Sequence, residues 1–122
     1  MRLILIAAII ICLVPPATAQ NNEMNSANAV IPMCALASKI LNGNVRLDAM
    51  DSYKAGYCLG IVQTAYNLSP AFQVCHPAGV KLRQQLRIAL IYILKTPARL
   101  HEPFELLALE AFREAWPCPS SL

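Results

Sequence analysis

The chain has 122 residues, which is the length of one ordinary domain. It is 57% apolar and only 14% charged, and this composition excludes a disordered, charge-rich polymer. The formal net charge is +3 and the basic residues are spread along the chain, so the sequence predicts no nucleic-acid binding. Arg83 and Arg87 lie one helical turn apart, and we interpret them as part of a solvent-exposed helix face.

The first nineteen residues have the layout of a secretory signal peptide. Arg2 supplies the positive charge, residues 3–14 are an uninterrupted apolar run, and Ala-Thr-Ala at 17–19 is a small-residue cleavage motif. The apolar run is too short to span a bilayer, which takes about 20 residues. We therefore expect cleavage after Ala19, export to the periplasm, and no membrane segment in the mature chain.

Apolar periodicity in the remaining chain predicts an all-α fold, a small disulfide-bonded bundle of about four helices. Residues 20–29 are polar and are expected to form a flexible lead before a domain over residues 30–119. No alternating β pattern of useful length occurs. The segment Ile88–Leu94 is apolar almost all round, which places it at the bundle centre or in a dimer interface. The expected helices are Pro32–Asn42, Asp48–Leu68, Gly79–Lys95 and Glu102–Ala115.

The cysteine count predicts disulfide bonds rather than a metal site. Cys12 leaves with the signal peptide, and an even number in a small exported domain indicates bridges. The spacings of 24, 17 and 43 residues lack the CxxC and HxxxH patterns of zinc sites. The four cysteines of the mature chain are Cys34, Cys58, Cys75 and Cys118.

The expected helical hairpins favour one pairing of these cysteines. A turn near residue 46 places Cys34 level with Cys58, about 12 residues away on either side. If the last two helices are antiparallel, Cys75 before the first of them meets Cys118 after the second. The competing arrangement, Cys58–Cys75 with Cys34–Cys118, stays open at this point.

The sequence offers no catalytic constellation and implies no cofactor. His76 is adjacent to Cys75 and therefore points away from it, and a catalytic cysteine would need a free thiolate. His101 precedes a helix, where capping or packing is the usual role. The phosphate-binding and nucleophile-elbow motifs are absent. We therefore expect a protein that is not an enzyme.

Two glycines four residues apart stand on one face of the second helix. Gly56 and Gly60 each lower helix stability by about 1 kcal/mol, and we interpret them as positions where another backbone packs closely.

Several segments in a fixed order resemble the Rap/Tai family of periplasmic immunity proteins. The first helix carries a cysteine, and the closing segment is WPC at Trp116–Cys118. Between them come GYCLGIV at Gly56–Val62, CHPAGVKLRQQ at Cys75–Gln85 and YILKTPARLHEPFELLALEAF at Tyr92–Phe112. The resemblance covers about residues 30–119, almost the whole expected mature chain.

The resemblance implies an exported, disulfide-bonded, mostly helical protein that commonly forms a homodimer. Its implied partner is a cognate peptidoglycan amidase effector of a type VI secretion system, which it blocks by occupying the active-site cleft. The matched motifs are scaffold residues, so we expect the inhibitory contacts in the loop Asn67–Val74. There Phe72 would be an aromatic anchor with Asn67, Ser69 and Gln73 as its polar rim. The alternative is that Phe72 folds back onto the core.

Two other functions remain open from the sequence. The first is a periplasmic acid-stress chaperone, although seven acidic residues are few for a protein that responds to acidification. The second is an envelope interaction module with the same fold and no toxin partner.

Overall fold

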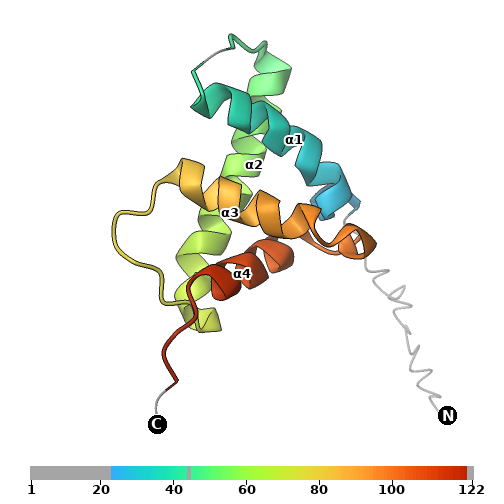
Figure 1. Cartoon of the computed structure of the whole chain (residues 1–122). Coiled ribbons are helices and arrows are strands. Elements are labelled where there is room, and N and C mark those ends of the chain that lie inside the picture. The colour runs from blue at the N-terminus through green and yellow to red at the C-terminus, as the bar shows by residue number, and fades with distance from the viewer. Residues whose placement is uncertain (1–22, 44, 121–122) are drawn as a thin grey trace, which may run out of the picture.

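The computed structural model describes residues 23–43 and 45–120, and the predicted signal peptide lies outside them. Within this part of the chain the secondary structure is helical without any strand, so the all-α prediction is confirmed (Figure 1). The α-helices are α1 (Ala27–Leu41), α2 (Ala49–Leu68), α3 (Leu82–Leu94) and α4 (Phe104–Ala115). The short 3-10 turns are η1 (Glu23–Asn25), η2 (Ser69–Phe72) and η3 (Pro97–Arg99).

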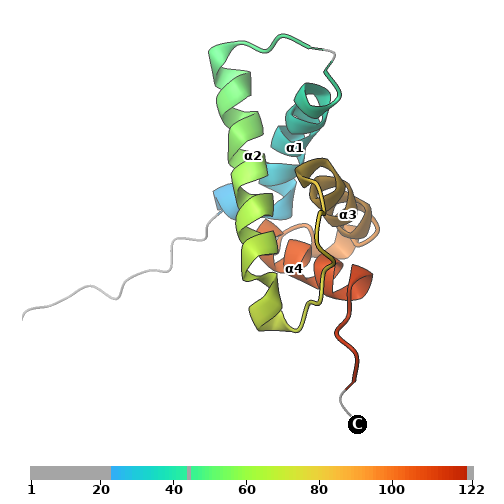
Figure 2. The same cartoon turned by 90° about the vertical axis from the view of Figure 1, so that its left-hand side faces the viewer.

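The helices form two hairpins that pack on each other. The chain reverses between the end of α1 at Leu41 and the start of α2 at Ala49, and again around η3 between α3 and α4. Figure 2 shows α2 along one edge of the molecule, with the other three helices on one side of it. One face of α2 is therefore left without a neighbour in the chain.

The first helix begins earlier than predicted, at Ala27 rather than Pro32. The Ser26 hydroxyl oxygen accepts a hydrogen bond from the Ala29 amide at 3.3 Å and caps the helix. The amides of Ala27 and Asn28 donate to backbone carbonyl oxygens of residues 102 and 100, each at 2.9 Å. These tertiary bonds satisfy N–H groups that a helix start leaves without partners. Residues 27–29 thus belong to α1 and not to a flexible lead, while residues 20–22 lie outside the described range.

Helices α3 and α4 begin a few residues later than predicted, for local reasons. Gly79 has φ of +83°, a left-handed conformation that cannot belong to a right-handed helix. Pro103 has ψ of 131°, so it precedes α4 as an extended residue and is not its first turn.

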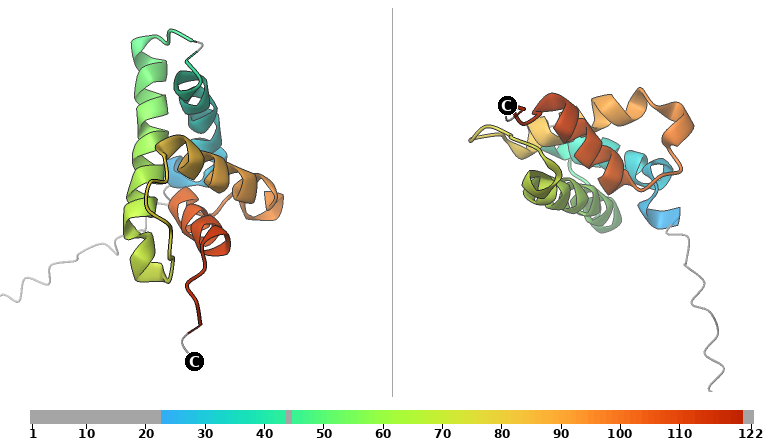
Figure 3. Two further views of the ribbon diagram at one scale, coloured as in Figure 1. Left: turned by 60° about the vertical axis from the view of Figure 1, so that its left-hand side comes forward. Right: turned by 90° about the horizontal axis from the view of Figure 1, so that it is seen from below.

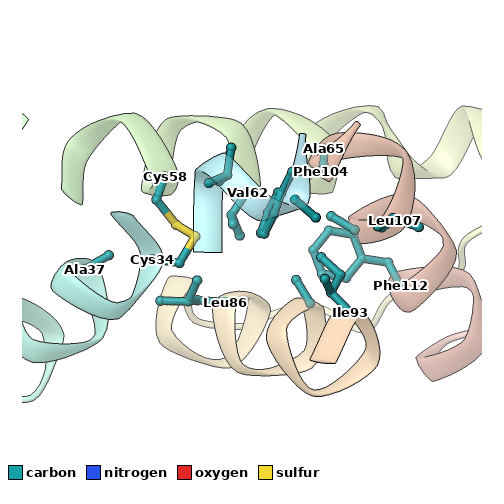
Figure 4. Packing of buried hydrophobic residues seen from close by; sticks show 14 of the residues in the cluster. Cys34, Ala37, Cys58, Val62, Ala65, Leu86, Ile93, Phe104, Leu107 and Phe112 are labelled. Carbon is teal, nitrogen blue, oxygen red and sulfur yellow. A yellow bond between two sulfur atoms is a disulfide. The ribbon is translucent and has the colours of Figure 1, made fainter. Parts of the chain in front are cut away.

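The core is built from all four helices and encloses one disulfide (Figure 4). Full burial of an aliphatic or aromatic side chain stabilises the fold by about 1.5–3 kcal/mol. The largest fully buried side chains are Phe104, Phe112, Ile93, Leu107, Val30 and Val62.

Both preferred cysteine pairings are confirmed, and the competing arrangement is wrong. The Cα atoms of Cys34 and Cys58 lie 5.2 Å apart, and those of Cys75 and Cys118 lie 4.8 Å apart. The first bridge is completely buried between α1 and α2. The second joins the segment before α3 to the tail after α4, and its Cys75 is exposed.

The apolar end of α3 is enclosed on one face only. Ala89 and Ile93 are fully buried, whereas Ile91 and Leu94 are 50% and 58% exposed. One side of α3 therefore packs in the core, as expected for a central helix, and the other side is exposed.

Candidate partner-binding surface

The uncovered face of α2 carries no charged side chain over residues 55–68. Gly56, Gly60, Thr64 and Leu68 follow one another at intervals of four residues, and all four are exposed. The sequence from 55 to 68 contains no acidic or basic residue. A solvated helix face normally carries charge, so this face has the composition of a surface that is covered by a partner.

The two glycines do not bring two segments of this chain together, contrary to the packing interpretation. A Cβ atom built at Gly56 or Gly60 would meet no heavy atom within 4 Å. The buried side of α2 is instead formed by Ala55, Cys58 and Val62. The glycine face is open in the described structure.

An apolar groove lies beside this face, between α2, η1 and α4. Its volume is about 490 Å³. Among the described residues that line it, Glu105 alone is charged. The Tyr57 hydroxyl donates a hydrogen bond to the side-chain oxygen of Asn25, and both residues line the groove. The lining consists of Asn25, Tyr57, Gly60, Ile61, Thr64, Ala65, Leu68, Glu105 and Leu109.

The turn η2 extends the apolar surface beyond the end of α2. Phe72 is 48% exposed and Leu68 is 54% exposed, so Phe72 does not fold back completely onto the core. Asn67 and Gln73 are also exposed. Figure 3 (left) shows this turn at the free end of α2, beside the tail that follows α4.

Ser69 is the one residue of the expected rim that the structure removes from it. Its side chain is fully buried. The hydroxyl donates to the Tyr66 carbonyl oxygen at 2.7 Å and so supports the end of α2. A partner therefore has no access to it.

The backbone at Gln73 is held in an uncommon conformation. Its φ is +62°, and among the described residues it is the only non-glycine with positive φ. This left-handed conformation costs about 1–2 kcal/mol and concentrates at functional sites. Its amide donates to the Ser69 carbonyl oxygen, which fixes the turn.

The segment after η2 is tied firmly to the body of the protein. The Cys75 amide donates to the Trp116 carbonyl oxygen at 2.9 Å, next to the Cys75–Cys118 disulfide. The Trp116 ring packs on Phe112 with ring centres 5.9 Å apart. A turn fixed in this way presents Phe72 without a large ordering cost on binding.

The two histidines have different surroundings. His76 Nδ1 lies 2.9 Å from the Tyr66 hydroxyl, and burial raises the pKa of Tyr66. His101 is exposed. All four cysteines of the described range are in disulfides, and no cluster of three or more metal-ligating side chains occurs in that range.

One charged cluster was not predicted from the sequence, and it has a structural position. The Arg99 guanidinium donates to both carboxylate oxygens of Glu102 and of Glu110, at 2.6–2.9 Å. Hydrogen bonds from Arg99 lower the pKa of both glutamates, and the two carboxylates raise the pKa of Arg99. The Tyr92 hydroxyl also donates to Glu110, at 2.8 Å. The cluster joins η3 and α3 to α4.

No helix in the described range combines the length and apolar character needed to cross a bilayer.

The sequence of this helical, disulfide-bonded domain matches a known family profile. The profile describes Rap1a immunity proteins and matches residues 26–118, about three quarters of the chain. The chain belongs to the Rap1a immunity protein family. No curated protein and no solved structure shows a significant match to it.

Membership in the Rap1a family indicates an immunity protein, which acts by binding a cognate effector and not by catalysis. The match begins at Ser26, the cap of α1, and ends at Cys118, the last cysteine of the second disulfide. It therefore covers the four helices together with both bridges.

Proposed function

We propose that this Rap1a-family protein is exported to the periplasm and blocks a peptidoglycan amidase effector of a type VI secretion system. The signal-peptide pattern at residues 1–19 supports export. Two intramolecular disulfides support an oxidising compartment such as the periplasm. An inhibitor needs a complementary surface rather than reactive groups, and the exposed Phe72 and Leu68 at the end of α2 offer such a surface.

The observation that carries this proposal is the rigid apolar end of α2. Phe72 stands on the turn η2, which the Gln73 amide closes by donating to the Ser69 carbonyl oxygen. The Cys75–Cys118 disulfide follows three residues later, and Phe72 is 48% exposed. Aromatic anchors at the centre of an interface contribute most of its binding energy. We place Phe72 in the active-site cleft of the effector, with Asn67 and Gln73 at the rim of the contact.

The size of the Phe72 contribution follows from its exposure. A buried aromatic side chain covers roughly 200 Å², and 48% of Phe72 is exposed in the free protein. A partner would then bury about 100 Å² more, which stabilises the complex by about 2.5 kcal/mol. The variant Phe72→Ala should therefore raise the Kd of the complex about 60-fold.

The experiment measures the affinity for the amidase encoded in the same genome, by calorimetry with purified proteins. Leu106→Ala is the matched control, because Leu106 is 49% exposed on α4 and does not line the groove. Phe72→Ala should weaken binding while its melting temperature stays close to that of the parent. Equal affinity together with lost stability would assign Phe72 to the core and contradict the proposal.

We also propose a homodimer, with the glycine face of α2 as its interface. In a two-fold dimer the same patch meets itself, so a charged patch would repel its copy. The α2 face carries no charge, whereas the outer face of α3 carries Arg83 and Arg87. Light scattering should show a dimer for the parent and a monomer for Gly60→Leu. A dimeric Gly60→Leu variant would contradict this interface.

A further inference from the structure

The acidic residues of this protein are absent from two of its four α-helices. The seven acidic residues lie at positions 23, 48, 51, 102, 105, 110 and 114. Helices α1 and α3 therefore contain none, and neither do the residues that join α2 to α3. The same two helices and their ends carry only cations, namely Lys39, Lys81, Arg83, Arg87 and Lys95. The face that α1 and α3 share is accordingly positive.

A groove of about 280 Å³ lies on this face, between the end of α1 and the outer side of α3. Figure 1 shows α1 on the side of α3 that faces away from α4. Arg83 and Arg87 line the groove together with Leu41, Leu90, Ile91 and Leu94. Ile91 and Leu94 are each at least half exposed. The groove thus places exposed aliphatic side chains directly beside two guanidinium groups.

The two arginines differ in what they already contact. The Arg83 guanidinium donates to the carbonyl oxygen of Leu41, one of the free carbonyls at the end of α1. Arg87 has no hydrogen-bond partner and no carboxylate within 4.0 Å among residues 23–43 and 45–120. Arg99, by contrast, is satisfied by two glutamates. Within the described part of the chain, the Arg87 guanidinium is therefore left able to pair with a carboxylate of another molecule.

We propose that the α1–α3 groove binds an acidic, amphipathic segment of a partner protein. Such a segment would place an apolar side chain on Ile91 and Leu94, and carboxylates against Arg83 and Arg87. An arginine fork suits a carboxylate because it can donate two parallel hydrogen bonds. This contact lies on different helices from the α2–η2 surface, and it stands independently of the identity of the effector.

A second copy of the chain does not fit the groove across a two-fold axis. The arginines of one copy would then face the arginines of the other, which is a repulsive arrangement. A flat anionic membrane is also a poorer match, since the apolar side chains lie in a concavity between two helices. The concave shape and the neighbouring charges favour a peptide segment.

The test uses the purified, oxidised protein and a synthetic peptide of three helical turns, with glutamates one turn apart and leucines between them. Methyl NMR signals of Ile91 and Leu94 should shift in a saturable manner, and less so at high salt. A peptide with glutamine in place of every glutamate should give at least tenfold weaker binding. Arg87→Glu should weaken binding of the acidic peptide about tenfold, whereas Arg113→Glu, the same charge change on α4, should leave it unchanged.

Several outcomes would overturn the proposal. The first is that the methyl NMR signals of Ile91 and Leu94 do not shift at millimolar peptide. The second is that signals shift over the whole molecule. The third is that Arg87→Glu binds the acidic peptide as tightly as the parent protein does. Shifts on concentrating the protein alone would instead indicate that a second copy occupies the groove. Sedimentation with phosphatidylglycerol vesicles that is lost in Arg87→Glu would assign the groove to a lipid surface. Each of these results is independent of any amidase, so it can be told apart from a failure of the proposed function.

Discussion

Removal of the two disulfides one at a time tests how each stabilises the fold. The bridges close loops with sequence separations of 24 and 43 residues. Loop-closure entropy alone assigns about 3.4 kcal/mol to Cys34–Cys58 and about 4.0 kcal/mol to Cys75–Cys118. Entropy alone therefore predicts that the second bridge is the more important one.

Burial reverses this order. Cys34 and Cys58 are both completely buried, so the double variant Cys34→Ala/Cys58→Ala also removes two sulfur atoms from the core. Each lost buried atom of this size costs about 1 kcal/mol, which brings the total to about 5 kcal/mol. Cys75 is exposed, so Cys75→Ala/Cys118→Ala should cost little beyond about 4 kcal/mol.

Urea unfolding followed by circular dichroism measures both free energies of unfolding. The buried pair should be the more costly one to remove, and the loss approaches the total stability of many domains of this size. The slope m should rise in both variants, because the unfolded chain becomes less compact without a bridge. If Cys75→Ala/Cys118→Ala has a lower free energy of unfolding than Cys34→Ala/Cys58→Ala, burial does not decide the order. Loop length alone would then explain how much each disulfide stabilises the fold.

Two further predictions concern charge and helix propensity. Arg99 lowers the pKa of Glu102 and Glu110, so its contribution is present above the usual glutamate pKa and disappears as pH falls through the lowered values. Arg99→Gln should therefore lower the melting temperature at neutral pH, and the gap should close in acid; a gap that persists in strong acid would contradict the ion-pair explanation. Gly60→Ala should raise the free energy of unfolding by about 0.5–1 kcal/mol, since a Cβ there meets no atom within 4 Å. Urea unfolding at low protein concentration, where the protein is monomeric, measures this change. A lower free energy of unfolding for Gly60→Ala than for the parent would contradict the conclusion that this face of α2 is open.

The sequence predicted the fold class and the cysteine pairing because both depend on local signals. Apolar periodicity and helix-breaking residues define the four helices, and two hairpins then bring the cysteines level. The predicted start of α1 is wrong because the first amides of this helix donate to carbonyl oxygens about 75 residues away. No local pattern reports such a bond.

The surfaces were harder to predict than the fold. Helix α2 has apolar residues on several sides, so its sequence does not show which face turns inward. The spacing of Gly56 and Gly60 predicts a packed face, whereas the structure leaves both glycines exposed. Ser69 looked like part of a polar rim because a hydroxyl is polar, but its hydrogen bond to the Tyr66 carbonyl oxygen allows it to be buried. The sequence predicts that Arg83 and Arg87 lie on a solvent-exposed helix face. The groove that they line exists because α1 lies beside α3, which the sequence does not show.

The central claim is that this protein inhibits a peptidoglycan amidase by stoichiometric binding. The most direct measurement is the cleavage of peptidoglycan by each amidase encoded in the same genome, titrated with the purified protein. We expect cleavage by one of these amidases to fall linearly with added protein and to stop at one protein per enzyme. Undiminished cleavage by every one of them in the presence of excess protein would contradict it.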